Sequence, residues 1–314
     1  MPKSSAKKAG QGTKVVAVTL GDPQGIGPEV VAKSVALHSP AGSLVIVGER
    51  RFFPGRSIRV IEDVRLARPG ETALLEVPAK GAAVDPSFSW VRAAVELGRQ
   101  GCVQAVVTGP VRKEKWLASG LPYRGHTDYL ATVARGGPPA MFFWSPGLKV
   151  ALFTHHLPLR EVFGQLEPRR IAAFVRGVDA ELRRLFARGF TYLFSGFNPH
   201  AGEGGHLGSE ELDCILPAMD DLRRDIPVAG MFPPDVVFAK ARFLEGAVVI
   251  AWTHDQGLIP FKLLHSSDGV QLTLGLPFVR TSPVHGTAVD IAGRGIADPT
   301  SMLAAIRLAE ALIP

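Results

Sequence analysis

The chain has 314 residues, of which 46% are hydrophobic and 20% are charged, as is typical of an ordinary soluble globular protein with one large domain or two. Part of its net charge of +6 falls in residues 1–13, which are predicted to be a disordered basic tail. This tail is not expected to be a signal peptide, because no apolar segment follows the lysines. The remaining mild excess of positive charge would suit an anionic substrate. Two lone cysteines favour a reducing compartment, no basic run interleaves with aromatics as in nucleic-acid binding, and the longest apolar runs are too short to cross a bilayer, so a cytoplasmic protein is expected.

Strands and helices are predicted to alternate along the chain. The first strand, 14–20, is a continuous apolar run typical of a strand buried on both faces, and a glycine-rich turn and a helix at 28–38 follow it. Further strands are predicted at 43–48, 57–61, 73–76, 103–108, 140–144, 149–154, 192–195, 227–230, 247–252 and 270–274. Further helices are predicted at 88–101, after 109, after 125, and at 159–163, 168–188, 210–224, 234–241 and 299–312. This alternation predicts a fold of α/β layers.

The segment 198–208 is the most unusual stretch of the sequence. Its eleven residues include two histidines, one glutamate and four glycines, between a predicted buried strand and a predicted helix. Glycine permits positive φ angles and close approach of the backbone to a ligand. A polar loop at the carboxyl end of a strand is where open α/β sheets bind ligands. The alternative is a surface turn with two solvated histidines.

Histidines follow three of the predicted strands, at His155-His156, at His200 and at His254. Neutral imidazole is a common ligand of Zn²⁺ and related ions, although a single histidine is more often structural. Three histidines in matching positions predict one metal site with open coordination positions, as catalysis requires.

Three cations, Lys113, Lys262 and Arg280, follow some of these strand ends and could meet a phosphate or a carboxylate. The alternative is a solvated surface charge, but Arg280 lies between apolar and turn-like residues and is expected to be partly buried. The turn 21–28 is not a GxGxxG segment and is a weak dinucleotide fingerprint.

Together these motifs resemble the 4-hydroxythreonine-4-phosphate dehydrogenase family, in order from residue 15 to the C-terminus and least clearly over 39–86. The matching segments are 21–29, 108–113, 125–128, 154–159, 198–206, 254–257, 274–282 and 285–288. The resemblance implies a divalent metal (zinc, cobalt, magnesium or manganese) in each active site, held by His156, His200 and His254. It implies substrate binding by His126, Thr127, Lys262, Gln271 and Arg280. Gln271 stands where an asparagine is common, and Asp128 replaces a frequent glutamate.

A second resemblance covers 283–299, which is similar to the adenosine-binding loop of isopropylmalate and isocitrate dehydrogenases. It implies NAD or NADP, contacted by His285, Gly286, Thr287 and Asp290. It also implies two α/β domains of that superfamily's type, with the active site in the cleft between them and at the interface of a homodimer that shares its sites. The expected domains are 14–133 with 258–314, and 134–257 with metal ligands and dimer contacts.

The function implied is metal-dependent, NAD(P)-linked oxidation of 4-phosphooxy-L-threonine at C3, with decarboxylation to 3-amino-2-oxopropyl phosphate, in pyridoxal 5'-phosphate (vitamin B6) biosynthesis. Lys113 or Asp255 is expected to assist proton transfer. One alternative is a paralogous dehydrogenase of 4-phospho-D-threonate, 4-phospho-erythronate or a cis-dihydrodiol. Another is a non-redox transferase of phosphate ligands, which would have no use for three histidines around a metal.

Overall fold

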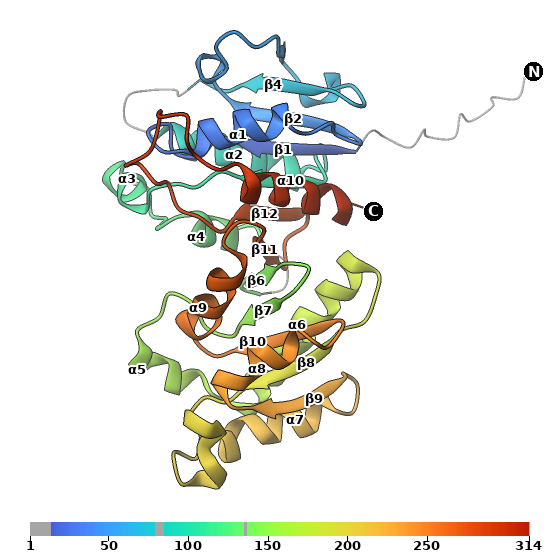
Figure 1. Ribbon diagram of the computed structural model, residues 1–314. Coiled ribbons are helices and arrows are strands. Elements are labelled where there is room, and N and C mark those ends of the chain that lie inside the picture. Colours follow the sequence, from blue (N-terminus) through green and yellow to red (C-terminus); the bar gives the residue numbers. More distant parts are fainter. Residues whose placement is uncertain (1–13, 79–84, 135–136, 314) are drawn as a thin grey trace, which may run out of the picture.

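The computed structural model describes residues 14–78, 85–134 and 137–313, and in these residues twelve strands form one sheet (Figure 1). The strand order is β3-β4-β2-β1-β5-β12-β11-β6-β7-β10-β8-β9. The strands are β1 Val15–Thr19, β2 Ser43–Gly48, β3 Arg59–Ile61, β4 Thr72–Glu76, β5 Ala105–Thr108, β6 Ala140–Trp144, β7 Lys149–Leu152, β8 Thr191–Ser195, β9 Val228–Phe232, β10 Ala247–Ala251, β11 Val270–Leu274 and β12 Val279–Pro283.

Two parallel sets of strands meet at an antiparallel centre. From β3 to β12 every neighbouring pair is parallel, and so is every pair from β7 to β9. Between them, β11 runs antiparallel to both β12 and β6, and β6 runs antiparallel to β7. The predicted division into domains, 14–133 with 258–314 and 134–257, stays a prediction. It would place the boundary within the sheet between β11 and β6.

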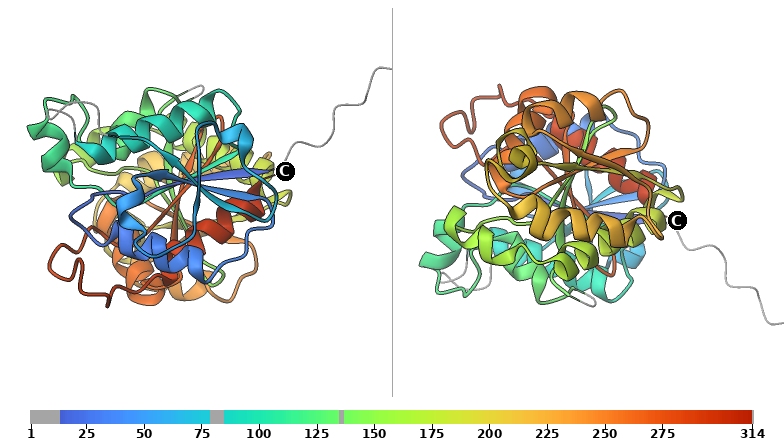
Figure 2. Two further views of the ribbon diagram at one scale, coloured as in Figure 1. Left: turned by 90° about the horizontal axis from the view of Figure 1, so that it is seen from above. Right: turned by 90° about the horizontal axis from the view of Figure 1, so that it is seen from below.

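Helices cover both faces of the sheet, which twists along its length (Figure 2). α1, α8, α9 and α10 lie on one face, and α2, α6 and α7 lie on the other. The helices are α1 Gly27–Ala36, α2 Pro86–Arg99, α3 Lys113–Ala118, α4 His126–Ala131, α5 Leu159–Val162, α6 Pro168–Phe186, α7 Leu216–Leu222, α8 Pro234–Ala241, α9 His254–His265 and α10 Thr300–Leu312. Within the described ranges, none of them is both long and apolar enough to span a membrane.

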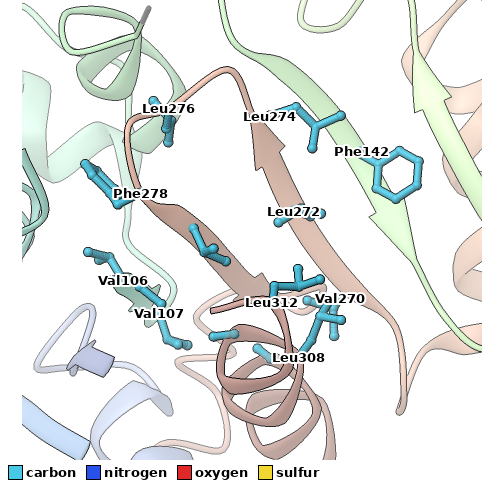
Figure 3. Packing of buried hydrophobic residues seen from close by; sticks show 14 of the residues in the cluster. Val106, Val107, Phe142, Val270, Leu272, Leu274, Leu276, Phe278, Leu308 and Leu312 are labelled. Carbon is cyan, nitrogen blue, oxygen red and sulfur yellow. The ribbon is translucent and has the colours of Figure 1, made fainter. Parts of the chain in front are cut away.

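The core follows from the continuous apolar runs of the sequence. All residues of β1, β2 and β10 are buried, as expected for strands covered on both faces. Figure 3 shows the packing at the centre, where Leu272 and Val270 of β11, Leu308 and Leu312 of α10 and Val107 of β5 belong to one buried cluster. Full burial of each such side chain stabilises the fold by about 1.5–3 kcal/mol. The α/β expectation is confirmed.

Two elements were not predicted. β12 was missed because the segment that leads into it contains proline, and α9 was missed because Gly257 and Pro260 interrupt its pattern. The Thr253 side chain caps α9 by accepting a hydrogen bond from the Gln256 N–H. Gly257 is needed for packing, since a Cβ there would lie 2.5 Å from Leu152 of β7. α9 therefore lies close against the sheet and places His254 at its first turn.

Candidate active site

A cavity of about 230 Å³ lies where the ends of β5, β7 and β10 meet the antiparallel strands β6, β11 and β12. Ten of the predicted site residues line it, namely Lys113, His126, Thr127, His156, His254, Lys262, Gln271, Arg280, His285 and Gly286. The other four, His200, Asp255, Thr287 and Asp290, are not among its lining residues. The fold thus brings together residues that are more than 150 positions apart in sequence.

Arg280 is the most deeply placed cation of the cavity, with only 4% of its surface exposed. Its guanidinium donates hydrogen bonds to Thr273 Oγ1 (3.0 Å), Gln271 Oε1 and Thr108 Oγ1, all of which are neutral. Its Nε has no partner among the described residues. Because burial opposes the charged form, the pKa of Arg280 falls to about 9. A desolvated cation without a carboxylate beside it suits an anionic ligand.

Neighbouring strands supply the acceptors that hold Arg280. In the antiparallel pair β11–β12, Thr273 lies opposite Arg280 and Gln271 lies opposite Ser282, whose hydroxyl donates to Gln271 Oε1 at 3.0 Å. Thr108, Thr273 and Ser282 were not among the predicted site residues. The sequence pattern that could have identified Thr273 and Ser282 is a pair of polar residues two positions apart on each of two apolar strands. Such residues face the same side of a sheet.

His126 begins α4 and faces the same cavity. Its Nε2 is shielded from solvent and has no hydrogen-bond partner among the described residues. Burial, together with the charges of Arg280 and Lys113, holds its pKa well below the ordinary 6.5. The imidazole is therefore neutral at neutral pH and keeps one ring nitrogen available to a ligand.

The unfolding free energy is expected to fall as the pH drops below about 6.5, partly because of His126. The unfolded chain protonates this ring near its ordinary pKa and the folded chain does not, so the unfolded state binds more protons in acid. Urea titrations at about pH 7.5 and about pH 5.5 measure the loss. The loss should be smaller in His126→Gln, and an equal loss in both proteins would show that this ring is not its source.

The cavity carries positive charge. Lys113 and Lys262 line it together with Arg280, and no aspartate or glutamate belongs to the lining in the described part of the chain. Such a surface raises the local concentration of anions. Both lysines are exposed to solvent, and both border the cavity that holds the buried arginine, where they could meet an anionic ligand.

His156 and His254 lie side by side, with ring centroids 5.6 Å apart. Two imidazoles that share one tetrahedral ion, with bonds of about 2 Å, place their ring centres about 5 Å apart, so this separation fits a metal. Burial, followed by Lys113 and the neighbouring histidines, lowers the pKa of His156 to about 4, which keeps it in the neutral form that binds metal. His254 Nδ1 lies 2.7 Å from Asp255 Oδ1, which leaves Nε2 of that ring for a metal.

His200 lies apart from that pair. Its side chain is 73% exposed and does not line the cavity. Across the described ranges, no three His, Cys, Asp or Glu side chains converge as a metal site. One chain therefore brings two of the three predicted histidines together, and the third lies on an exposed turn.

The turn that carries His200 is left-handed. Residues 200–205 all have positive φ, between 42° and 97°, inside the short helix η4 Pro199–Gly205. Glycine adopts this conformation freely, which explains Gly202 and Gly204, but His200, Ala201 and Glu203 each cost roughly 1–2 kcal/mol there. His156 also has a positive φ of 52°. Strained backbone of this kind concentrates at functional sites.

The segment 285–297 runs from the cavity along the start of α1. The Ile26 N–H donates to the Thr287 carbonyl at 2.8 Å, and the Glu29 carboxylate accepts from the Ala297 N–H at 2.8 Å. His285 and Gly286 line the cavity, whereas Gly293 and Gly295 line a second cavity of about 570 Å³ beside the 21–29 turn. The predicted cofactor segment is thus held at both ends by the first turn and helix of the chain.

Comparison with known proteins gives a family and its activity class. Residues 55–309 match the family described as "Pyridoxal phosphate biosynthetic protein PdxA". A 4-hydroxythreonine-4-phosphate dehydrogenase of Chromobacterium violaceum is 40% identical over 317 residues, 95% of this chain and 96% of the relative. A D-threonate 4-phosphate dehydrogenase of Salmonella typhimurium is 38% identical over 321 residues, 95% of this chain and 98% of the relative.

Solved structures agree. A 4-hydroxythreonine-4-phosphate dehydrogenase from Klebsiella pneumoniae has a TM-score of 0.80 at 34% identity, covering 96% of this chain and 100% of that chain. A β-decarboxylating dehydrogenase from Thermococcus kodakarensis, at 16% identity and a TM-score of 0.54, shows the fold alone. The expected fold is confirmed, and the two relatives above, both named dehydrogenases, support an oxidoreductase. With the family match over 255 residues and relatives near 40% identity over most of its length, the chain belongs to the pyridoxal phosphate biosynthetic protein PdxA family.

Proposed function

We propose that this chain is a metal-dependent, NAD- or NADP-linked dehydrogenase that oxidises 4-phosphooxy-L-threonine at C3, with decarboxylation to 3-amino-2-oxopropyl phosphate, in pyridoxal 5'-phosphate biosynthesis. The observation that carries the proposal is a single cavity that contains both the His156–His254 pair and the buried Arg280, which has no carboxylate beside it among the described residues. Such a cavity offers an anion site and a metal site to the same small molecule.

The phosphate end of the substrate is assigned to four residues. Arg280 offers a charge-assisted contact through its unpartnered Nε, and His126 offers its free ring nitrogen. Thr127 and Lys262 line the same cavity. Gln271 is assigned an indirect role in substrate binding, because its carbonyl oxygen already accepts from Arg280 and from Ser282.

The metal end is assigned to His156 and His254 of one subunit and His200 of a second. The side-by-side imidazoles and the hydrogen bond from His254 to Asp255 fit a divalent ion such as zinc, cobalt, magnesium or manganese. His200 is exposed on a rigid turn, where it can reach another subunit. A homodimer with shared active sites accounts for its separation from the pair.

The cofactor is assigned to the segment that holds His285, Gly286, Thr287 and Asp290. When bound, the metal would polarise the substrate hydroxyl and the nicotinamide would accept the hydride. The chain's own residues orient the reacting groups: Arg280 fixes the phosphate, and His285 and Gly286 border the cavity from the cofactor side. Lys113 lines the cavity and is assigned a part in proton transfer from the hydroxyl.

Lys113 and Asp255 are expected to respond differently to substitution. Lys113→Ala should lower kcat by about 10²–10⁴-fold with metal content unchanged, because it removes a group that assists proton transfer. Asp255→Asn should weaken metal affinity by about 10–100-fold, because Asp255 orients His254. Steady-state kinetics with metal analysis separates the two effects. Normal turnover in both variants would show that neither is an essential base.

A substrate comparison on purified protein tests the proposal. Reduction of NAD⁺ and NADP⁺ is followed with 4-phosphooxy-L-threonine, 4-phospho-D-threonate, 4-phospho-erythronate and a cis-dihydrodiol. The highest kcat/KM is expected with 4-phosphooxy-L-threonine, and faster turnover of phospho-threonate would overturn the vitamin B6 assignment. If a metal-loaded protein reduces neither cofactor with any of them, the non-redox transferase alternative is favoured.

The second candidate substrate, 4-phospho-D-threonate, has one structural observation in its favour. The described cavity lining contains no carboxylate to meet the ammonium group of a threonine derivative, whereas a threonate carries a hydroxyl instead. The two relatives with these activities are 40% and 38% identical to this chain, so identity does not separate the candidates. The kinetic comparison does.

A further inference from the structure

Glu211 is a buried carboxylate beneath the turn that carries His200. Only 1% of its surface is exposed, and it begins a five-residue π-helical turn, Glu211–Ile215, ahead of α7. Turns of this type are frequent at functional sites. In the described part of the chain, neither lysine nor arginine forms an ion pair with it.

The charge of Glu211 is met by the segment that leads into the turn. Its Oε1 accepts hydrogen bonds from the backbone N–H groups of Phe197 (2.8 Å) and Asn198 (2.7 Å). Its Oε2 accepts from the Asn198 side-chain amide at 2.9 Å. These charge-assisted bonds are stronger than bonds between neutral groups, and they fix the chain two residues before His200.

The same carboxylate lies against the inside of the turn. A Cβ added to Gly202 would lie 2.7 Å from Glu211 Oε2. The turn also closes on itself, because the Leu207 N–H donates to the Gly202 carbonyl at 3.1 Å. Six successive residues with positive φ persist only when their surroundings hold them there. Glu211 supplies a buried, hydrogen-bonded part of those surroundings.

We infer that Glu211 is a positioning residue that sets the direction of His200 and so completes the metal site. The inference rests on the proposed role of His200 as a metal ligand. Glu211 itself touches neither substrate nor metal, and it acts through the backbone at Phe197 and Asn198. An uncharged glutamine would present an amide N–H₂ to the Asn198 amide, donor against donor, and would loosen this contact.

The test compares Glu211→Gln, His200→Ala and the double variant. Zinc affinity is measured by equilibrium dialysis of the intact protein, and amide hydrogen exchange is followed over residues 196–208. We expect Glu211→Gln to speed exchange at Phe197 and Asn198 and to weaken zinc binding about tenfold or more. In the His200→Ala background, where zinc binding is expected to be abolished, the same change should still speed exchange at Phe197 and Asn198, because Glu211 holds the backbone and not the imidazole.

Asp179→Asn is the matched control. Asp179 is also buried, at 7% exposure, and it accepts a hydrogen bond from the Tyr192 hydroxyl without touching the turn. This variant should lower the thermal midpoint but leave zinc affinity and exchange over 196–208 unchanged. An equal loss of zinc affinity in Asp179→Asn, or wild-type exchange and affinity in Glu211→Gln, would overturn the inference.

Failure of the proposed function gives a different result. If His200→Ala binds zinc as tightly as the wild type, His200 is not a ligand and the metal site itself is wrong. If His200→Ala loses zinc and Glu211→Gln does not, only the positioning role fails. Should Glu211→Gln not fold, Asn198→Ala removes one of the three bonds and should show the same pattern at smaller size. Unchanged exchange and affinity in that variant overturn the inference as well.

Discussion

Arg280→Met is expected to lower kcat/KM for the phosphorylated substrate about a thousandfold without lowering the thermal midpoint by more than a few degrees. Removing one partner of a buried charge contact costs about 3–5 kcal/mol, and each 1.36 kcal/mol is a factor of ten. The thermal midpoint changes little because the wild type, without ligand, buries the Arg280 charge beside neutral groups only, which is unfavourable and lowers its pKa to about 9. Methionine removes that cost. Steady-state kinetics and thermal unfolding measure the two effects.

Inorganic phosphate separates binding from folding in this variant. Phosphate should raise the thermal midpoint of the wild type, because a ligand that binds only the folded state stabilises it, and it should not raise that of Arg280→Met. Arg280→Lys keeps a charge but loses the forked donors, and should fall between the two. The anion site is assigned wrongly if Arg280→Met retains kcat/KM within tenfold of the wild type.

His200→Ala and His254→Ala are each expected to abolish metal binding and activity, and a mixture of the two should regain part of both. If His200 comes from the second subunit, a hybrid dimer has one intact site and one site that lacks two ligands. Random exchange of subunits then restores about a quarter of wild-type activity. Subunits are exchanged under mild denaturant, and zinc content and turnover are measured before and after mixing.

His206→Ala is the matched control for this experiment. His206 lies on the same exposed segment as His200, just after the left-handed turn, and no ligand role is assigned to it. Its substitution should reduce activity distinctly less. A mixture that stays inactive although hybrid dimers form contradicts the shared site, and equal losses in His200→Ala and His206→Ala contradict the specific role of His200.

Local patterns and the family resemblance predicted most strands and helices and ten of the residues that line the cavity. A histidine of the pair 155–156 and His254 were expected together because each follows a predicted strand, the resemblance selected His156, and the structure places His156 and His254 side by side. Arg280 was expected to be partly buried from its apolar neighbours and is almost fully buried. The local pattern sufficed in these cases, because the ends of buried strands gather at one place in an α/β sheet.

The remaining features depend on contacts that a local pattern does not contain. Helix α9 forms through Pro260 because Gly257 allows it to pack on β7, which is a tertiary effect. The hold of Thr108 on Arg280 depends on the pairing of β5 with β12. The separation of His200 from the other histidines was not expected from spacing, because spacing along the chain does not show where an exposed turn lies in space.

Helix α9 acts as a ruler. His254 at its first turn and Lys262 eight residues later lie about 12 Å apart along the axis, at 1.5 Å per residue. With the proposed metal at one end and the proposed phosphate site at the other, helix α9 sets the distance that a ligand must span. The enzyme would then select the length of its substrate as well as its end groups. One residue inserted between the two positions would lengthen the helix by about 1.5 Å and turn Lys262 by about 100°.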